Sequence, residues 1–312
     1  MFSNRSGVSV DPSGVPKWAF ARAWRRLPRP PDTPITTVAP DLEFLHANRE
    51  RPSFTWIGHA SFLKQIGGLN VLVDPVFSRV ISPVPPFGPR RHQPPGLLPS
   101  TLPHIDVVVI SHSHYDHLDV ASVRAVQRQP GGPPQFLVPQ GLDAWFARVV
   151  PGSRVRAFAW DEHWRGPNGV EFHFLPVQHW SSRTPLRRND TLWGSWAMVH
   201  STHRFWYSGD LGYSDDPARI GAQFGHFDLA AIGIGAYEPR WFMRAQHVNP
   251  EEAVQVMLDV RAAAAIGVHW GTFPLSDESL DEPPRALARA LAARALPPER
   301  FRVLSPGETL RP

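Results

Sequence analysis

Residues 107–119, VVVISHSHYDHLD, change within a few positions from β-branched side chains to imidazole and carboxylate groups. The apolar part predicts a buried, parallel strand. His112, His114, Asp116 and His117 follow it within six residues, at the strand end where ligands converge in layered α/β folds. Because these groups suit zinc-like ions, the stretch predicts a site that could supply ligands to two neighbouring metal ions. The alternative is a polar loop with chance histidines.

Three later strands are each predicted to end in another donor of the same kind. GVEFHFLPVQH ends at His179, RFWYSGD ends at Asp210, and AAAIGVHW carries His269 near its end. Glycines beside Asp210 leave its carboxylate sterically free to bridge two metals, although an isolated turn aspartate would look the same. Together with the first cluster these residues supply seven donor groups. That number is enough for two ions with a shared carboxylate and open positions for water.

The absence of cysteine strengthens this interpretation. None of the 312 residues is Cys, so any metal must be held by His, Asp or Glu, and the redox compartment cannot be inferred from disulfides. With 42% hydrophobic residues the chain can bury a substantial core. We favour one large domain over two small ones.

The hydrophobic pattern of the sequence indicates where the protein is located, and its net charge indicates the kind of partner it favours. The sequence has no run of about eighteen apolar residues that could span a membrane, and its first twenty residues lack the apolar core of a secretory signal, so a cytoplasmic protein is expected. The net charge of +4 and the pI near 9.9 favour anionic partners such as phosphate esters or membrane surfaces. Ordinary basic solubility is an equal alternative. The basic residues form no aromatic-interleaved stripe, which argues against nucleic acid.

Residues 1–52 form a Pro- and Arg-rich lead-in, which is expected to pack on a single domain of residues 53–312. Within the lead-in, interleaved aromatic and basic side chains predict a short basic amphipathic helix. This helix either touches lipid, at the surface of the inner membrane, or packs on the domain. Its residues are Trp18, Phe20, Arg22, Trp24, Arg25, Arg26 and Leu27.

The first strands of the domain are predicted over SFTWIGHASFLKQI and LNVLVDP, with Gly67 and Gly68 as the hairpin turn. Asp74 ends the second strand, where its carboxylate either holds a ligand imidazole in place from behind or caps the following turn. His59 is interpreted either as a further support of the site or as a structural histidine. Residues 82–103 form a long Pro-rich loop, which is expected to shape a pocket mouth or lid.

The remaining chain alternates helices and strands, which predicts an α/β architecture. Helices are expected after the caps Asp119 and Asn249, over GLDAWFARVV, and over the C-terminal PPRALARALAARAL with Leu287 and Leu291 on one face. The expected strands are QFLVP, VRAFAW, GVEFHFLPVQH, WGSWAMVH, RFWYSGD, DLAAIGIG and AAAIGVHW.

The HSHYDH spacing resembles the HxHxDH signature of the metallo-β-lactamase superfamily. Further blocks narrow the match, because in order they resemble N-acyl-phosphatidylethanolamine-hydrolysing phospholipase D and its bacterial relatives over about Phe54 to Leu275. These blocks are WIGHASFL, NVLVDPVFS, ISHSHYDHLD, VQHWSSR, LWGSW, SGDLGY, IGAYEPRWFM, QHVNPEEAV and VHWGTF. The resemblance implies the four-layer αββα sandwich of the metallo-β-lactamase fold.

The resemblance also implies a division of the metal ligands. His112, His114 and His179 would hold one zinc ion. Asp116, His117 and His269 would hold the other, with Asp210 bridging the two ions. Other divalent ions such as Mn²⁺ or Fe²⁺ are alternatives to the two Zn²⁺.

On the substrate side, Gln246 and His247 match the family's QHVxPEEA block, and Tyr115 lies within the histidine motif. We expect Gln246 and His247 to contact substrate, with His247 touching the phosphate or protonating a leaving group. Tyr115 is expected to line the cleft, with packing as its alternative. Ser113 and Leu211 depart from the family pattern, and neither departure removes a ligand.

The reaction implied is attack of a metal-bound hydroxide on phosphorus, with Asp210 and Asp116 orienting the nucleophile. The products from an N-acyl-phosphatidylethanolamine would be phosphatidic acid and an N-acylethanolamine. Arginines in loops could face an anionic headgroup or simply be solvated. They are Arg90, Arg91, Arg183, Arg187 and Arg188.

Two other hypotheses are kept. One is a hydrolase of the same fold with a soluble substrate, such as a phosphorylated lactone or a cyclic phosphodiester. The other is a non-catalytic metal or lipid binder, which the intact donor set disfavours. The resemblance leaves a homodimer open.

Overall fold

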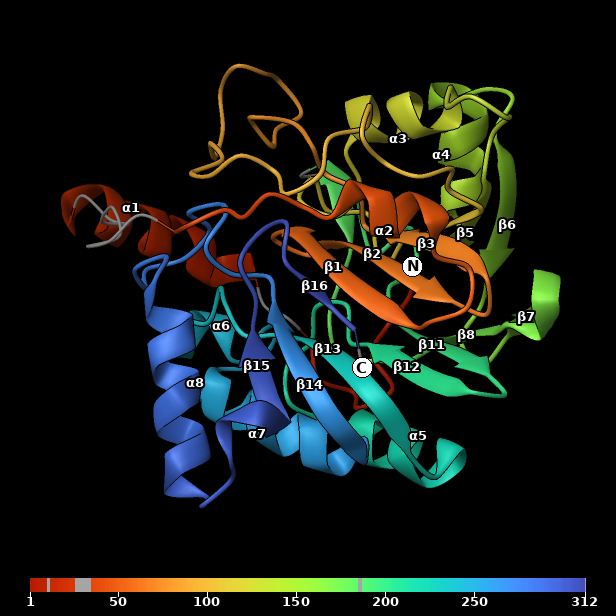
Figure 1. Cartoon of the computed structure of the whole chain (residues 1–312). Coiled ribbons are helices and arrows are strands. Elements are labelled where there is room, and N and C mark those ends of the chain that lie inside the picture. Colours follow the sequence, from red (N-terminus) through yellow and green to blue (C-terminus); the bar gives the residue numbers. More distant parts are fainter. Residues whose placement is uncertain (10–11, 26–34, 185–186, 312) are drawn as a thin grey trace.

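Two seven-stranded sheets face each other in the described part of the chain (Figure 1). The computed structural model describes residues 1–9, 12–25, 35–184 and 187–311. The first sheet has the order β16-β1-β2-β3-β4-β5-β6 and the second has the order β15-β14-β13-β12-β11-β8-β7. In each sheet the strands are antiparallel on one side and parallel on the other.

The strands of the first sheet are β1 (Ser53–Gly58), β2 (Ser61–Ile66), β3 (Leu69–Val73), β4 (Val107–Val109), β5 (Gln135–Pro139), β6 (Arg154–Phe158) and β16 (Thr309–Leu310). Those of the second are β7 (His163–Arg165), β8 (Glu171–Leu175), β11 (Ser195–His200), β12 (His203–Tyr207), β13 (Phe227–Gly233), β14 (Ala262–Val268) and β15 (Phe301–Val303). A separate hairpin pairs β9 (Ser182–Thr184) with β10 (Arg187–Arg188).

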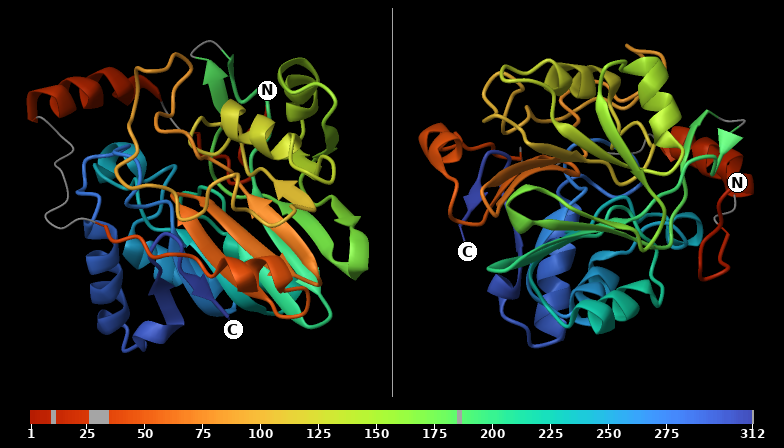
Figure 2. Two further views of the ribbon diagram at one scale, coloured as in Figure 1. Left: turned by 45° about the horizontal axis from the view of Figure 1, so that its top comes forward. Right: turned by 90° about the vertical axis from the view of Figure 1, so that its right-hand side faces the viewer.

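Helices cover the outer face of each sheet (Figures 1 and 2). On the first sheet, Leu45 of α2, Val123 of α3 and Phe146 of α4 share one apolar cluster with strand residues. On the second sheet, α5 and α8 each pack on α7, and α7 packs on β13 and β14. The helices are α1 (Val15–Arg25), α2 (Leu42–Ala47), α3 (Val120–Gln127), α4 (Leu142–Val149), α5 (Asp216–Phe224), α6 (Arg240–Met243), α7 (Pro250–Asp259) and α8 (Glu282–Ala293). The predicted four-layer αββα sandwich is confirmed.

Strands β1 to β4 are buried along their whole length, on both faces of the sheet, as is typical of strands rich in apolar residues. In β2, for example, Phe62 and Ile66 enter the core between the sheets, while Leu63 enters the cluster beneath the helices. β4 pairs in parallel with both β3 and β5. The predicted buried parallel strand before the histidine cluster is therefore confirmed.

Local signals in the sequence located several elements correctly. Asp119 caps α3, and Asn249 and Glu252 form a reciprocal capping box at the start of α7. Gly67 and Gly68, both with positive φ, make the predicted turn between β2 and β3. Local patterns predicted none of α2, α5, α6, β7, β9, β10, β15 and β16.

The single first strand predicted over residues 53–66 is wrong, because the chain turns at His59 and forms β1 and β2. Gly58 has a φ of 131° and His59 a φ of 54°, conformations that favour a tight turn over an extended strand. Distant residues stabilise this turn. The His59 N–H donates to Thr272 Oγ1, and the His59 carbonyl accepts from the His269 N–H at 2.9 Å.

The predicted amphipathic helix of the lead-in is α1, although Arg26 and Leu27 lie outside the described residues. Trp18 packs inward, because its ring stacks on Phe242 and its Nε1 donates to Asp277. Phe20 and Trp24 instead are 73% and 81% exposed. One face of α1 therefore packs on the rest of the protein, and contact of its exposed face with lipid stays a prediction. The division of the chain into a lead-in of residues 1–52 and a domain of residues 53–312 stays a prediction. Within the described residues, no helix is long and apolar enough to cross a bilayer.

One charged side chain lies inside the core between the sheets. Lys64, one of two lysines in the chain, is fully buried on β2. Its Nζ lies 3.1 Å from His203 Nε2 and 5.1 Å from the centre of the Phe205 ring. Burial lowers the pKa of Lys64 to about 7, against the opposing influence of Asp228. In the unfolded chain the pKa of the Lys64 ammonium group would be near 10.4.

We expect Lys64→Met to stabilise the protein at neutral pH by about 1–4 kcal/mol, as apolar replacements of buried charges often do. Between about pH 7 and 10 the unfolded chain binds the Lys64 proton and the folded one does not, so stability should rise with pH in this window and the variant should lose that rise. Denaturant unfolding at several pH values measures both effects. The control is Lys17→Met on α1, which should change neither. A destabilised Lys64→Met protein with an unchanged pH dependence would contradict the expectation.

Candidate metal centre

The structure brings all seven predicted donor residues together at one edge of the sandwich. Four of them lie in the loop between β4 and α3, and the other three follow β8, β12 and β14. All seven side chains are buried or nearly so. They are His112, His114, Asp116, His117, His179, Asp210 and His269.

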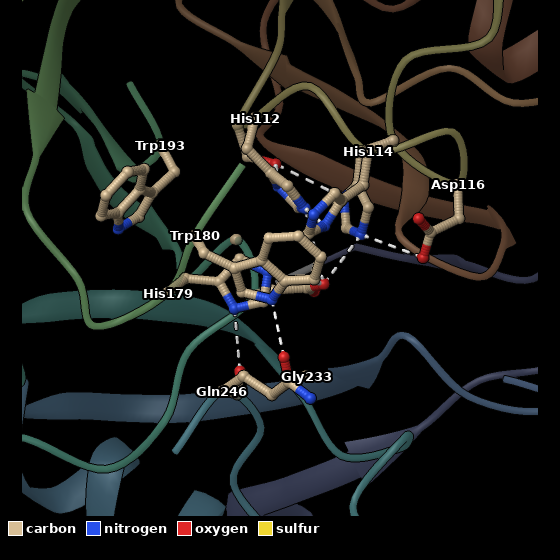
Figure 3. Close-up of polar contacts among 12 residues, drawn as sticks. His112, His114, Asp116, His179, Trp180, Trp193, Gly233 and Gln246 are labelled. Atoms are coloured by element: carbon tan, nitrogen blue, oxygen red, sulfur yellow. Dashed lines mark hydrogen bonds and ion pairs between the residues drawn. The ribbon is translucent and has the colours of Figure 1, made fainter. Parts of the chain in front are cut away.

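The first donor set consists of His112, His114, His179 and Asp210, whose donor atoms all lie within 4.8 Å of one another. His112 Nε2 lies 2.8 Å from His114 Nδ1. Asp210 Oδ2 lies 3.7 Å from both His112 Nε2 and His179 Nε2. Figure 3 shows His112, His114 and His179 converging from different directions.

The second donor set consists of Asp116, His117 and His269 together with the same Asp210 oxygen. Asp210 Oδ2 lies 3.1 Å from His117 Nε2 and 3.2 Å from His269 Nε2. Asp116 Oδ2 lies 3.2 Å from His269 Nε2 and 3.5 Å from His117 Nε2. His59 joins this set from the turn between β1 and β2, with Nε2 2.9 Å from Asp116 Oδ2.

The donor atoms fit metal ions in chemistry and spacing. Nitrogen and oxygen ligands around a tetrahedral ion, at about 2.0–2.1 Å from it, lie about 3.4 Å from one another. The separations in both donor sets bracket this value. In addition, His117 Nε2 and His179 Nε2 are buried and have no hydrogen-bond partner. Buried polar atoms normally have one, so the lone pairs of these nitrogens are available to a metal cation.

Two buried carboxylates dominate the electrostatics of the centre. Burial would raise the pKa of Asp210 and Asp116, but neighbouring histidines, His117 first, hold both pKa values well below the usual range. Burial would lower the pKa of His117 and His269, but Asp210 outweighs it, and the pKa of His269 rises to about 9. Ionised carboxylates therefore attract positive charge here, whether as protons or as metal cations.

The remaining histidines are held in the neutral form that binds metal. Burial lowers the pKa of His112 well below its usual value, that of His114 to about 4 and that of His179 to about 3. His179 Nδ1 lies 2.9 Å from the Gln246 carbonyl oxygen. Because a carbonyl only accepts, Nδ1 carries the proton and Nε2 presents its lone pair to the centre.

Asp74 lies directly behind His117. Its Oδ2 accepts from His117 Nδ1 at 2.8 Å, from Ser111 Oγ at 2.5 Å and from Tyr207 Oη at 2.7 Å. Burial and the charge of Asp74 raise the pKa of Tyr207 well above its usual value, so Tyr207 remains a donor. Tyr207 comes from the second sheet, on the core face of β12, and no pattern in the sequence distinguishes it from an ordinary packed aromatic residue.

Tyr115 and Arg183 contact each other beside the loop between β4 and α3. Tyr115 Oη donates to the Arg183 carbonyl at 3.0 Å, and the guanidinium lies 4.0 Å from the centre of the tyrosine ring. Arg183 also donates to the Ser113 and Leu118 carbonyls, at 3.0 and 2.7 Å. Arg183, which was expected to face a headgroup or to be solvated, therefore secures the loop that carries four of the donors. Arg91, donating to the Val76 and Ser78 carbonyls, is likewise a structural residue.

A cleft of about 490 Å³ opens above the donor residues. Tyr115, Gln246 and His247 line it as predicted, and the Pro-rich loop contributes Pro83 and Pro89 to its wall. Trp180 Nε1 donates to Gln246 Oε1 at 2.6 Å (Figure 3), so the Gln246 amide is already engaged with the protein. Trp180 is a cleft residue that the sequence interpretation missed, although its position next to His179 was a signal.

The fold and the paired donor sets define a metal-dependent hydrolase of the β-lactamase type. The chain matches the model of the Beta-lactamase superfamily domain over residues 69–270. It is 39% identical over 251 residues to N-acyl-phosphatidylethanolamine-hydrolyzing phospholipase D 1 of Caenorhabditis elegans, with 77% of this chain and 70% of that protein covered. An uncharacterized protein of Mycobacterium tuberculosis is 38% identical, covering 90% of this chain and 74% of its own length.

Solved structures share the fold at low identity. A metallo hydrolase from the archaeon Ignicoccus hospitalis has a TM-score of 0.63 at 19% identity, covering 84% of this chain and 98% of its own. Isothiocyanate hydrolase from Delia radicum gut bacteria has a TM-score of 0.64 at 15% identity, covering 83% and 98%. The chain belongs to the metallo-β-lactamase superfamily, in the family of the N-acyl-phosphatidylethanolamine-hydrolysing phospholipases D. The predicted resemblance is thereby confirmed.

We expect Asp210→Ala to lose both metal ions and His269→Ala to lose one, because the Asp210 oxygen is shared by both donor sets whereas His269 belongs to the second. Activity should fall more than about 100-fold in each variant. Metal content per chain, measured by mass spectrometry after dialysis, distinguishes the two losses. The exposed His226 supplies the control variant His226→Ala, which should keep wild-type metal content. Retention of two ions by Asp210→Ala would contradict the assignment.

Proposed function

We propose that the protein is a binuclear zinc phosphodiesterase of phospholipase D type, which cleaves N-acyl-phosphatidylethanolamine-like lipids to phosphatidic acid and N-acylethanolamine. The observation that carries the proposal is the character of the cleft. Its floor is formed by donor residues such as Asp116, Asp210 and His269. Its walls are mostly apolar, with Val15, Trp18, Ile81, Phe242, Met243 and Leu275, and Ser182, Arg183, Thr184 and Arg188 also line it.

An apolar groove next to a polar floor matches the two parts of a phospholipid. Each methylene group of an acyl chain gains about 0.8 kcal/mol on leaving water, so these walls favour a lipid over a small polar substrate. A phosphorylated lactone or cyclic phosphodiester would leave most of this apolar surface unused. The family relationship supports the same choice, because the Caenorhabditis elegans relative is by its name a phospholipase D for this lipid class.

The residues at the floor divide the chemical roles. Bound zinc ions would polarise a phosphoryl oxygen and acidify a water molecule. Asp116 and Asp210 would orient that water through their carboxylate oxygens. Burial lowers the pKa of His247 to about 3, so its ring is neutral. A neutral ring favours contact with a phosphoryl oxygen through its N–H over proton donation to the leaving group.

Contact with a membrane surface is part of the proposal. α1 reaches the cleft through Val15 and Trp18, and its outer side exposes Phe20 and Trp24. Lys17 on the same helix lies 5.0 Å from the centre of the Trp241 ring, and Trp241 is itself 56% exposed. Exposed aromatics beside basic groups are typical of segments that lie in the membrane interface. This face would bring the cleft to its lipid at the surface of a bilayer.

We expect the purified, zinc-loaded protein to release N-acylethanolamine from N-acyl-phosphatidylethanolamine in mixed micelles. In H₂¹⁸O one labelled oxygen should appear in phosphatidic acid, because water attacks phosphorus. Mass spectrometry follows both products, and a parallel panel contains bis(p-nitrophenyl) phosphate, cyclic nucleotides and phosphorylated lactones. No lipid turnover alongside rapid opening of a lactone would refute the proposal. Metal analysis of protein purified without added metal decides between zinc, manganese and iron.

A matched pair of variants tests the apolar wall. Leu275→Arg places a charge in the cleft. It should lower kcat/KM for a long-chain lipid by about 10- to 100-fold, since burial of one apolar side chain is worth about 1.5–3 kcal/mol. Turnover of bis(p-nitrophenyl) phosphate should stay within about twofold of the wild type. Leu258→Arg alters a half-exposed leucine on α7 instead and should leave both rates unchanged. Equal losses for the two substrates would show that the wall does not select lipid.

We expect the double variant Phe20→Ser, Trp24→Ser to bind anionic phospholipid vesicles several-fold more weakly than the wild type, because apolar area and basic charge together give interfacial binding. Sedimentation with vesicles measures the binding, and bis(p-nitrophenyl) phosphate reports the soluble activity, which should persist. Leu258→Ser is the surface control. Unchanged vesicle binding by the double variant would contradict a membrane role for α1.

A further inference from the structure

The first residues of the chain lie along the loop that carries His179. Phe2 N–H donates to the Asn189 carbonyl at 2.8 Å, and Ser6 Oγ donates to Gln178 Oε1 at 2.9 Å. Both views of Figure 2 place the N-terminus beside the β9–β10 hairpin. Contacts at residues 2 and 6 therefore fasten both ends of a short segment against the metal centre.

Asn4 lies between these two anchor points and reaches furthest inward. Its Oδ1 accepts from the backbone N–H of His179 at 3.0 Å and from Trp193 Nε1 at 3.1 Å. Its Nδ2 donates to the Val8 carbonyl at 2.9 Å, which fixes the orientation of the amide, because only the oxygen can then face the two donors. Both donors belong to buried residues, since His179 is 1% and Trp193 0% exposed.

Single hydrogen bonds hold the backbone around His179, among them Trp193 Nε1 to the Val177 carbonyl at 3.0 Å and the Ser181 N–H to Asn189 Oδ1 at 3.1 Å. Residues 176–181 form no strand, and Gln178 makes an isolated bridge to Gly212. The ring of His179 is oriented at Nδ1 by the Gln246 carbonyl. Asn4 secures the backbone N–H of the same residue. Together the two contacts hold both the ring and the backbone of His179, whose Nε2 lies 3.7 Å from Asp210 Oδ2.

We propose that Asn4 is a positioning residue for the first donor set, and that the N-terminal segment is thereby a working part of the metal centre. The proposal rests on the proposed function in that the first donor set holds a metal ion. It assigns no contact between Asn4 and substrate or metal. Asn4 acts through the main chain of His179, about 175 positions away in sequence. The neighbouring Arg5–Asp161 ion pair is exposed and only fastens the segment.

The test compares Asn4→Leu, which removes the acceptor, with Asn4→Asp, which keeps one. In Asn4→Leu the affinity for one of the two zinc ions should fall about 10- to 100-fold, as for other groups that orient a metal ligand. The affinity for the other ion should not change. Asn4→Asp should recover to within a few-fold of the wild type. Competition with a chromophoric chelator measures both affinities, and the spectrum of the cobalt-substituted protein reports the geometry of the first donor set.

Ser6→Ala is the matched control, because it removes a hydrogen bond between the same segment and the adjacent Gln178 while leaving the His179 N–H paired. It should keep both affinities and the cobalt spectrum. Asn4→Ala is measured alongside Asn4→Leu, in case the larger side chain prevents folding. The role of Asn4 would be overturned if Asn4→Leu and Asn4→Ala both kept the wild-type affinities and cobalt spectrum. It would also be overturned if Asn4→Asp lost as much affinity as Asn4→Leu. A wild-type protein that binds fewer than two ions would overturn the two-metal function instead, whatever Asn4 does.

Discussion

Asp210 Oδ2 is the atom around which the centre is arranged, because histidines of both donor sets lie within 3.7 Å of it. A buried carboxylate beside two sets of imidazoles provides negative charge that favours bound cations. It can do so only if loops following strands of both sheets meet at one edge of the sandwich. The packing of the two sheets therefore determines the distance on which the chemistry depends.

Groups outside the donor sets hold the donors in place, and they come from distant parts of the chain. Asp74 accepts from His117, and Tyr207 of the opposite sheet donates to Asp74. The main chain of Gln246 orients the ring of His179, and Asn4 secures its backbone. Such contacts fix which nitrogen carries the proton and which faces the metal. The centre is thus stabilised by packing of the whole molecule and not by the histidine loop alone.

The apolar cleft connects the centre to the surface through segments outside the two sheets. Trp18 of α1 stacks on Phe242, so the N-terminal helix and α6 together build one wall. The Pro-rich loop, through Pro83 and Pro89, contributes to another part of the lining. The same helix that builds the wall exposes Phe20 and Trp24 outward. Substrate entry and contact with a lipid surface are therefore linked through α1 in the proposed function.

The sequence alone determined the alternation of strands and helices, the strands that end in donors and the seven donor residues, because burial of both sheet faces and local caps leave patterns a few residues long. The αββα sandwich followed from the family resemblance of the sequence blocks. The sequence did not reveal the turn at His59, the loop-securing role of Arg183, or the support from Tyr207 and Asn4. Those features depend on contacts such as His59 with Thr272 and Asn4 with His179, which join residues far apart in the chain. Only the tertiary structure decided them. The hydrogen-bond partner of a buried group depends on which distant elements pack against it, and the local sequence of one element does not encode that packing.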